Sequence, residues 1–183
     1  MENKTIEALK TRRSIRKYTE EKLSPEQIET LVQVALSSPS AKNFQPWHLT
    51  VVQDAELIAQ WEREIVQYFV DMGDTKTVEW HAKRNNKIFY DAPVVFVISM
   101  EPDKGIDVGI MAQSIAVAAK SMDLGSVILG FPRVVFSEEE GEKWQQRLNF
   151  PKGHTYGISV AVGHAAEGGR DREIDKSKVS YIG

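Results

Sequence analysis

Residues 107–130 constrain the fold more than any other stretch, because the helix that they predict carries apolar side chains on every side. Within residues 108–122, Lys120 is the only charged side chain. The run is too short and too often interrupted by polar residues to span a bilayer. It therefore favours a helix buried in a soluble domain or at a subunit interface. We expect Asp107 to be its N-cap, and Gly125 to stop it before a buried strand at residues 126–129.

Composition narrows the class of protein further. A chain of 183 residues with 42% hydrophobic and 27% charged residues fits one globular domain, so residues 1–183 are expected to form a single domain. The net charge of -3 gives no overall basic field for nucleic acid or for anionic lipid. The absence of cysteine excludes disulfides, thiolate metal sites and cysteine nucleophiles. The N-terminal residues lack an apolar signal core, so a cytoplasmic location is expected.

A basic cluster follows the short amphipathic pattern at the N-terminus. Four basic side chains surround a serine within six residues: Arg12, Arg13, Ser14, Arg16 and Lys17. Planar guanidinium groups and a hydroxyl in such proximity are suited to holding a phosphate bidentately. The alternative is a solvated basic turn paired with Glu20 and Glu21. The cluster alone does not decide between the two.

A clear helix start comes next, and a polar loop follows that helix. Ser24 is the predicted N-cap, with Pro25 at the first helical position and Gln27 completing a capping box. Residues 38–48 then form a loop rich in short polar side chains: Ser38, Ser40, Asn43 and Gln45. Such a loop suits the edge of a planar polar ligand. Equally, its side chains would serve as turn-stabilising groups in a helix-to-strand connection.

The remaining segments alternate between strand and helix patterns. Strands are predicted at residues 48–52 and 94–99, and the second is apolar enough to be buried on both faces. Residues 71–86 have a weak pattern, which we interpret as a mobile segment with a short helix that could act as a lid. Residues 156–162 alternate large and small side chains, which predicts a strand with one nearly bare face.

Motifs for common chemistry are missing. The sequence has no GxGxxG, P-loop or GxSxG pattern, and its four histidines stand far apart without metal-ligand spacing. Each histidine is therefore expected to be a surface or hydrogen-bonded residue, and no metal site is predicted. No side chain stands out as catalytic. Either a cofactor carries the chemistry, or the protein is not an enzyme.

Four segments in order resemble the flavin-dependent nitroreductase family along nearly the whole chain. They are residues 12–18 with the helix start after them, residues 38–48, residues 89–95 and residues 107–130. The resemblance implies an α+β fold with a mixed, largely antiparallel sheet flanked by helices. It also implies an obligate, intertwined homodimer with two FMN sites at the interface.

The same resemblance implies a role for individual residues. Arg12, Ser14 and Arg16 match the segment that grips the phosphate, ribityl chain and pyrimidine edge of FMN, and Arg172 or Arg170 matches a late basic residue at the phosphate. The loop after residue 38 matches one that reaches the flavin of the other subunit. The predicted cofactor-binding residues are, in full, Arg12, Arg13, Ser14, Arg16, Pro39, Ser40, Ala41, Asn43, Gln45, Asn85, Lys87, Leu129, Gly130, Arg170 and Arg172.

The expected function is transfer of two electrons from NADH or NADPH through FMN to an electron-poor acceptor such as a nitroaromatic or a quinone. The expected partners are therefore a small-molecule acceptor and a second copy of the chain, with neither nucleic acid nor membrane. The alternatives are a flavin-dependent dehydrogenase or dehalogenase on the same fold, and a noncatalytic FMN-binding or interaction protein. The resemblance does not fix the acceptor, because one fold serves many substrates.

Overall fold

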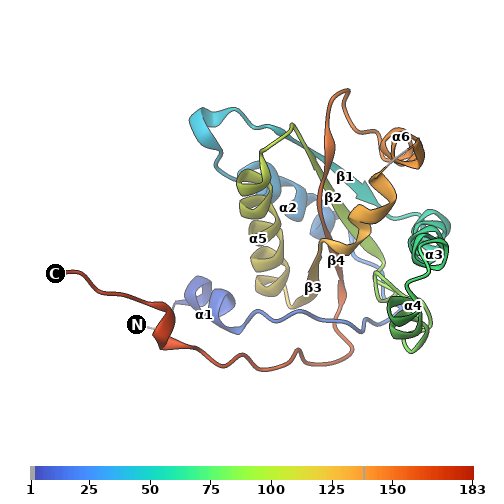
Figure 1. The fold of residues 1–183 in the computed structure, drawn as a ribbon. Helices are drawn as coiled ribbons and strands as arrows, with labels where there is room; N and C mark the ends of the chain where they lie inside the picture. Colours follow the sequence, from blue (N-terminus) through green and yellow to red (C-terminus); the bar gives the residue numbers. More distant parts are fainter. Residues whose placement is uncertain (1–2, 138) are drawn as a thin grey trace.

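A four-stranded antiparallel sheet forms the centre of the protein, in the computed structural model that describes residues 3–137 and 139–183 (Figure 1). Its strands are β1 (Trp47–Val52), β2 (Val94–Met100), β4 (Thr155–His164) and β3 (Leu124–Leu129), in this spatial order. The predicted α+β class is confirmed. Within the described residues, the parallel component of the sheet is one isolated bridge between Ser14 and Ser126.

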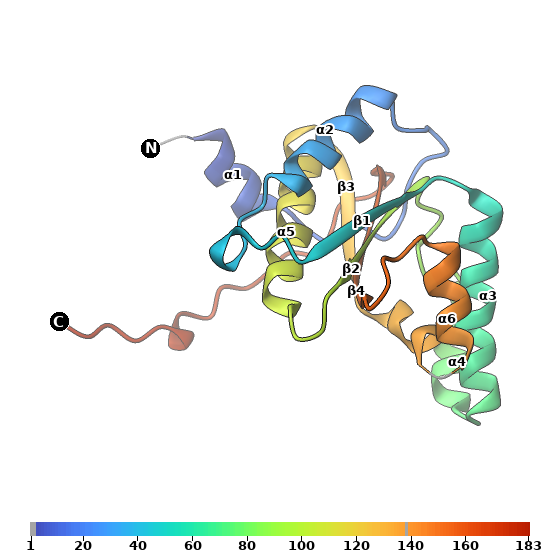
Figure 2. The same ribbon diagram turned by 90° about the horizontal axis from the view of Figure 1, so that it is seen from above.

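Helices cover both faces of the sheet (Figure 2). One face carries α5 (Gly105–Ser121) and α2 (Pro25–Leu36), with α1 (Lys4–Thr11) beside α5. The other carries α3 (Ala55–Asp71), α4 (Thr75–Ala82) and α6 (Glu139–Arg147). Three short 3-10 helices complete the described elements: η1 (Ala41–Asn43), η2 (Phe131–Phe136) and η3 (Lys176–Lys178). None of the helices in these described residues is long and apolar enough to cross a membrane.

Strand β2 is buried on both faces, as its apolar run predicts. Phe96 and Ile98 pack against α5 and α2, whereas Val95 and Val97 belong to the core beneath α3 and α6. Because successive side chains in a strand point to opposite faces, one continuous apolar run supplies both cores. The sheet is therefore the middle layer of three.

Strand β4 departs from its predicted pattern at a bulge. The register with β2 shifts between Ile98 and Ser99, so Gly157 is an extra residue in β4. An extra residue reverses the facing of everything beyond it. Tyr156 therefore lies in the core under α3, while the later large side chains face α5: Ile158, Val160 and Val162. The prediction of one uniform large-residue face is wrong at Tyr156.

Of two predicted helix starts, that of α2 is confirmed and that of α5 is wrong. Ser24 caps α2 with the full capping box, since its side chain accepts from Gln27 N and the Gln27 side chain accepts from Ser24 N. The prediction that Asp107 caps α5 is wrong, because the helix already begins at Gly105. Asp107 lies in the first turn instead, where its Oδ1 accepts a hydrogen bond of 3.2 Å from Ala41 N. A carboxylate there still complements the helix dipole.

One side of α5 is open in the single chain. Ile106 is 83% exposed and Ile110 is 36% exposed, whereas Met111 and Ile115 are fully buried. The expectation that α5 is buried nearly all round is therefore not met within one subunit. An apolar side left in water on a central helix is typical of a surface that another chain covers.

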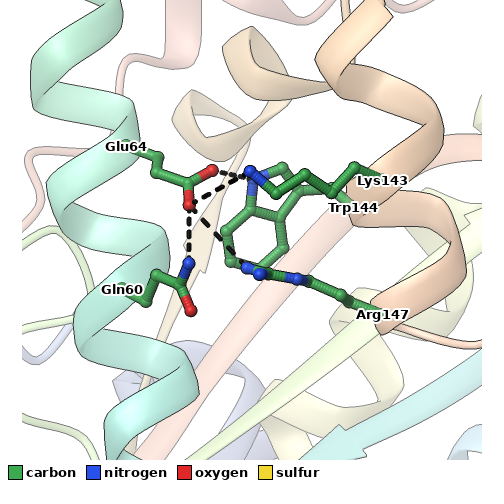
Figure 3. A network of polar contacts seen from close by, with 5 residues as sticks. All are labelled: Gln60, Glu64, Lys143, Trp144 and Arg147. Carbon is green, nitrogen blue, oxygen red and sulfur yellow. Dashed lines mark hydrogen bonds and ion pairs between the residues drawn. The ribbon is translucent and has the colours of Figure 1, made fainter.

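Helices α3 and α6 are joined by a buried tryptophan and a polar network (Figure 3). Trp144 Nε1 donates a hydrogen bond of 2.7 Å to Glu64 Oε2, and Gln60 Nε2 donates one of 2.8 Å to Glu64 Oε1. Arg147 Nη1 and Lys143 Nζ lie 3.7 and 3.8 Å from Glu64 Oε1. The carboxylate thus satisfies the indole N–H, which would be costly to leave unpaired in the core.

Candidate functional site

Residues 12–19, here called the basic strip, pass the free edge of β3 at Ser126 and continue to the end of β4 and the tail at residues 164–166. Ser14 forms a parallel bridge with Ser126, and Ile15 N donates a hydrogen bond of 2.9 Å to Ser126 O. Successive side chains of an extended segment point to opposite sides. Ile15 is accordingly buried in the core, while Ser14 and Arg16 line a cavity on the other side.

Gly125 allows this close approach of the strip to β3. A Cβ atom at Gly125 would lie 2.9 Å from Ile15 Cγ2, closer than packed side chains tolerate. The prediction that Gly125 stops the preceding helix is wrong, because β3 has already begun at Leu124. Helix α5 ends at Ser121, and Asp123 makes the turn with a φ of 59°.

The far end of the strip is tied to β4 and the tail. Lys17 O accepts a hydrogen bond of 3.0 Å from Ala166 N. The buried Tyr18 hydroxyl donates to Ile15 O at 2.9 Å. Burial raises the pKa of Tyr18, so the phenol remains a protonated donor. The strip is thereby held at both ends by β-type pairing.

The basic strip forms one wall of a cavity of about 930 Å³. The other walls are residues 84–91 after α4 and residues 167–170 of the tail. Its lining contains five basic side chains and two acidic ones: Arg16, Lys17, Arg84, Lys87 and Arg170, against Asp91 and Glu167. The volume lies at the upper end of the usual range for ligand pockets, about 300–1,000 Å³. The cavity is therefore large and positively charged.

The wall at residues 84–91 has an unusual backbone. Four of its residues have positive φ, namely Asn85 (52°), Asn86 (58°), Tyr90 (59°) and Asp91 (60°). Asparagine tolerates this region, but a tyrosine there is uncommon and costs free energy unless its surroundings impose it. A buried carboxylate supplies part of that constraint, because Glu62 Oε1 on α3 accepts a hydrogen bond of 2.8 Å from Phe89 N.

Glu62 also acts on the charge of this wall. Its residue is 5% exposed, and its Oε2 lies 3.8 Å from Lys87 Nζ, which is 2.7 Å from Asp91 Oδ1. Burial raises the pKa of Glu62, and the hydrogen bond from Phe89 and the charge of Lys87 oppose that rise. The hydrogen bond to Asp91 raises the pKa of Lys87, with a further contribution from Glu62. Lys87 is thus a held, positively charged group.

Three arginines gather at the other end of the strip. Burial lowers the pKa of Arg12, and the charges of Arg172 and Arg13 lower it further. The Nε atoms of Arg12 and Arg13 are buried without a hydrogen-bond partner, and within the described residues none of the three forms an ion pair. Unpaired buried donors with mutually repelling charges fit a bound anion such as a phosphate.

The tail approaches this cluster closely at a glycine. A Cβ atom at Gly169 would collide with Arg13 Cβ, so a side chain there would push the tail away from the strip. Arg12 and Arg13 border a second cavity of about 270 Å³, which shares Gly168 and Gly169 with the large one. The arginine cluster and the large cavity therefore adjoin one another.

The large cavity brings together five of the predicted residues: Ser14, Arg16, Asn85, Lys87 and Arg170. Arg170 and Arg172, which the sequence left as alternatives, take different places. Arg170 lines the large cavity, whereas the charge of Arg172 acts on Arg12.

The loop that contains Pro39, Ser40, Ala41, Asn43 and Gln45 does not join them within one chain (Figure 1). Ala41 contacts Asp107 at one end of α5, whereas Lys120 near its other end borders the arginine cavity. Thirteen helical residues separate these ends by about 20 Å. The loop satisfies some of its own groups, since Gln45 N donates to Ser40 Oγ at 2.9 Å and Gln45 Nε2 donates to Asn43 Oδ1 at 3.2 Å.

Leu129 and Gly130 lie at the end of β3, outside the lining of the large cavity. The Leu129 carbonyl accepts a hydrogen bond of 2.9 Å from the Tyr156 hydroxyl. Burial raises the pKa of Tyr156, so this donor stays protonated. The backbone at the end of β3 is therefore fixed from the core side.

Several cavity residues were not predicted, above all Trp80 and Arg84. Arg84 Cζ lies 3.7 Å from the centre of the Trp80 ring, and both side chains line the large cavity. Their spacing of four residues at the end of a helix is the available sequence signal, because such residues meet on one side. The weak apolar pattern of residues 71–86 hid it. The expected short helix there is confirmed as α4.

His81 contradicts the expectation that each histidine is exposed or hydrogen-bonded. It is 2% exposed, and neither ring nitrogen has a hydrogen-bond partner among the described residues. Its ring packs 4.6 Å from that of Trp80 and 4.7 Å from that of Phe131. Burial lowers the pKa of His81, and the charge of Arg84 lowers it further, so the ring is held neutral. Aromatic packing explains its position.

Comparison with known proteins places this geometry among related folds. The sequence model of the Nitroreductase family matches residues 9–164. A Desulfitobacterium hafniense nitroreductase crystallised with bound FMN superposes with a TM-score of 0.94, at 31% identity over 100% of both chains. An FMN-dependent nitroreductase from Clostridium difficile gives 0.86, at 28% identity over 100% of both chains. A Methanothermobacter thermautotrophicus protein, provisionally named an NADH dehydrogenase/NAD(P)H nitroreductase, is 31% identical over 92% of this chain and 81% of its own.

Proposed function

Because this chain belongs to the nitroreductase family, we propose that it passes two electrons from NADH or NADPH to an electron-poor acceptor such as a nitroaromatic or a quinone. It is an FMN-dependent NAD(P)H oxidoreductase, and FMN when bound supplies the two-electron chemistry. The observation that supports the proposal is the cluster of unpaired buried arginine donors beside a positively charged cavity large enough for a flavin.

The proposed reaction balances with the donor alone. Reduction of a nitro group to a nitroso group consumes one NAD(P)H and one proton, and it releases NAD(P)⁺ and water. Reduction of a quinone to a hydroquinone consumes the same donor and proton without forming water. No further co-reactant is needed for either acceptor.

The residues of this chain supply binding and electrostatics. Arg12, Arg13 and Arg172 hold the phosphate, because the buried Nε atoms of Arg12 and Arg13 lack hydrogen-bond partners and the charge of Arg172 lies close enough to lower the pKa of Arg12. Arg16 and Lys87 place positive charge in the cavity, where they stabilise negative charge on a reduced ring system. Leu129 and Gly130 lie outside the lining of the large cavity, so their predicted place beside the reacting edge of the ring would require the flavin to extend beyond that lining.

Spectroscopy of the purified protein tests the proposal. Reconstitution with FMN should give a flavin absorbance spectrum, and anaerobic NADH or NADPH should bleach it. Addition of a nitroaromatic or a quinone should then restore the oxidised spectrum. A protein that takes up no FMN would refute the cofactor assignment, and a bound flavin that neither donor bleaches would favour the noncatalytic alternative.

We also propose that each site is shared between two subunits. The open side of α5 is apolar at Ile106 and Ile110, and Phe44 on the polar loop is 63% exposed beside it, so a second copy would cover an otherwise unfavourable surface. The separation along α5 keeps the loop with Asn43 away from the arginine cavity of its own chain. Asn43 would serve the partner's flavin, while Arg12 serves its own.

Mixed dimers test this sharing. Suppose that Arg12→Ala and Asn43→Ala each inactivate the homodimer, and that differently tagged copies are co-expressed so that the mixed dimer can be isolated. If the two residues meet across the interface, one site carries both lesions and the other none, so up to about half of the activity should return, given independent sites. A well-folded mixed dimer that stays inactive would contradict the assignment of Asn43.

A further inference from the structure

We propose that Trp80 and Arg84 form a binding platform for planar aromatic acceptors that carry a negatively charged group, such as a carboxylate. The proposal deepens the oxidoreductase function above and rests on it. It assigns the substrate class to two residues to which the family resemblance gives no role in FMN binding, on the wall of the cavity formed by the end of α4 and the residues after it.

The arginine is held in place without being neutralised. Its Cζ lies 3.7 Å from the centre of the Trp80 ring, and its Nη1 donates a hydrogen bond of 3.1 Å to Trp80 O. Within the part of the chain that the structure describes, no carboxylate forms an ion pair with Arg84. A ring and a carbonyl thus fix a guanidinium group whose charge remains free for a ligand.

Arg84 differs from the other cations of the cavity in its setting. Lys87 is paired with Asp91 at 2.7 Å, Arg16, Lys17 and Arg170 belong to the basic strip and the tail, and the arginine cluster around Arg12 serves the phosphate. Arg84 is therefore a positive charge that the cavity wall presents on an aromatic surface. A ligand that satisfies both features has a flat ring and an anionic substituent.

The platform has a firm base. Trp80 is 46% exposed, and its ring centre lies 4.6 Å from that of the buried His81. The His81 ring lies 4.7 Å from that of Phe131, which in turn lies 5.0 Å from that of Phe69. This aromatic series joins α4 to η2, which begins directly after Gly130. The platform is thereby positioned relative to the end of β3. Stacking on the indole suits electron-poor rings, because indole is electron-rich, and the guanidinium group attracts the anionic substituent of the same ligand.

Matched substrates and matched variants isolate the charge of Arg84. We would measure kcat/KM of the FMN-loaded protein for 4-nitrobenzoate and for its uncharged methyl ester, and take the ratio. In Arg84→Gln that ratio should fall about three- to fivefold, the scale of one exposed ion pair. The control is Lys83→Gln, which removes the same charge from a neighbouring exposed residue outside the cavity lining, and its ratio should equal that of the parent.

Tryptophan fluorescence gives a readout that does not depend on turnover. Trp61 and Trp144 are fully buried and Trp47 is nearly so, which leaves Trp80 as the accessible fluorophore among the four tryptophans. Binding of 4-nitrobenzoate to the oxidised FMN-loaded protein should quench this emission saturably. The quenching should be lost in Trp80→Leu, and its midpoint should shift to higher ligand concentration in Arg84→Gln.

A dinucleotide also combines planar rings with anionic groups, so NADH and NADPH are the alternative ligands of the Trp80–Arg84 platform. An Arg84→Gln protein with an unchanged substrate ratio overturns the proposal and leaves the oxidoreductase function intact. The proposal is also overturned if Arg84→Gln changes only the binding of NADH or NADPH, measured in anaerobic flavin reduction, since the platform would then serve the donor. If neither donor reduces the parent's flavin, the oxidoreductase function itself has failed, while saturable quenching at Trp80 still decides whether the platform binds the anion.

Discussion

Replacement of Glu62 tests whether one buried carboxylate holds the cavity wall at residues 84–91. In Glu62→Ala the Phe89 N–H loses its acceptor at 2.8 Å, and Phe89 is fully buried, so water is poorly placed to replace it. An unpaired buried donor costs about 1–3 kcal/mol. Lys87 loses one partner but keeps Asp91 at 2.7 Å, which limits the electrostatic part of the loss. We therefore expect the free energy of unfolding to fall by about 1–3 kcal/mol.

Glu62→Gln separates the hydrogen bond from the charge, because the amide oxygen still accepts from Phe89 N. Its effect should depend on pH. The folded pKa of Glu62 is raised by burial, so between the unfolded pKa and the folded pKa the native state binds more protons than the unfolded state. In that window the stability of the parent falls as pH rises. Glutamine does not ionise, so its stability has no such pH dependence. Glu62→Gln should therefore gain stability relative to the parent as pH rises through the window.

Urea denaturation of the parent and both variants measures these effects, at several values between about pH 4 and 8 with a fixed FMN concentration. The reasoning requires that alanine is clearly worse than glutamine at neutral pH. It also requires the glutamine-minus-parent difference to rise with pH. Equal losses in the two variants would refute the role of the hydrogen bond, and a pH-independent difference would refute the raised pKa.

Three further substitutions have defined outcomes. Arg12→Ala should weaken FMN binding by about 1.5–3 kcal/mol with the fold retained, and a fluorescence titration that finds parental affinity would show that the arginine cluster does not hold the phosphate. Tyr156→Phe should lower the free energy of unfolding by about 1–3 kcal/mol, because Leu129 O and the buried Ser159 hydroxyl both lose the phenol as a partner, and denaturant unfolding measures it. Gly125→Ala should cost about 1–3 kcal/mol by crowding Ile15 at 2.9 Å, and an unchanged melting temperature would contradict that close packing.

Local signals in the sequence predicted local structure well. The Ser24 capping box depends on residues three apart and forms as expected. The two-sided burial of β2 follows from its uninterrupted apolar run. The predicted start of α5 is wrong because Asp107, a good capping residue, lies two residues after the true start at Gly105, where the N-cap residue makes no side-chain hydrogen bond. A long-range contact with Ala41 explains that aspartate better than capping does.

The site was harder to predict, because it depends on register and on distance. Nothing local reveals that Gly157 is an extra residue in β4, since the bulge exists only relative to β2. The resemblance assigned the loop around Asn43 to the flavin of the other subunit, and the length of α5 supplies the physical reason why this loop lies far from Arg12 of its own chain. The sequence does not predict Trp80 and Arg84 as site residues, because apolar residues do not recur at helical spacing in their segment.

The position of the basic strip against β3 links ligand loss to solubility. β3 is the outermost strand on its side of the sheet, and an uncovered outer strand invites pairing with other chains and aggregation. The strip shields that strand at Ser126, and the same strip carries Arg12 and Arg16. A ligand that binds these arginines therefore also stabilises the pairing of the strip with β3. Flavin-free protein should consequently precipitate sooner on storage than protein saturated with FMN.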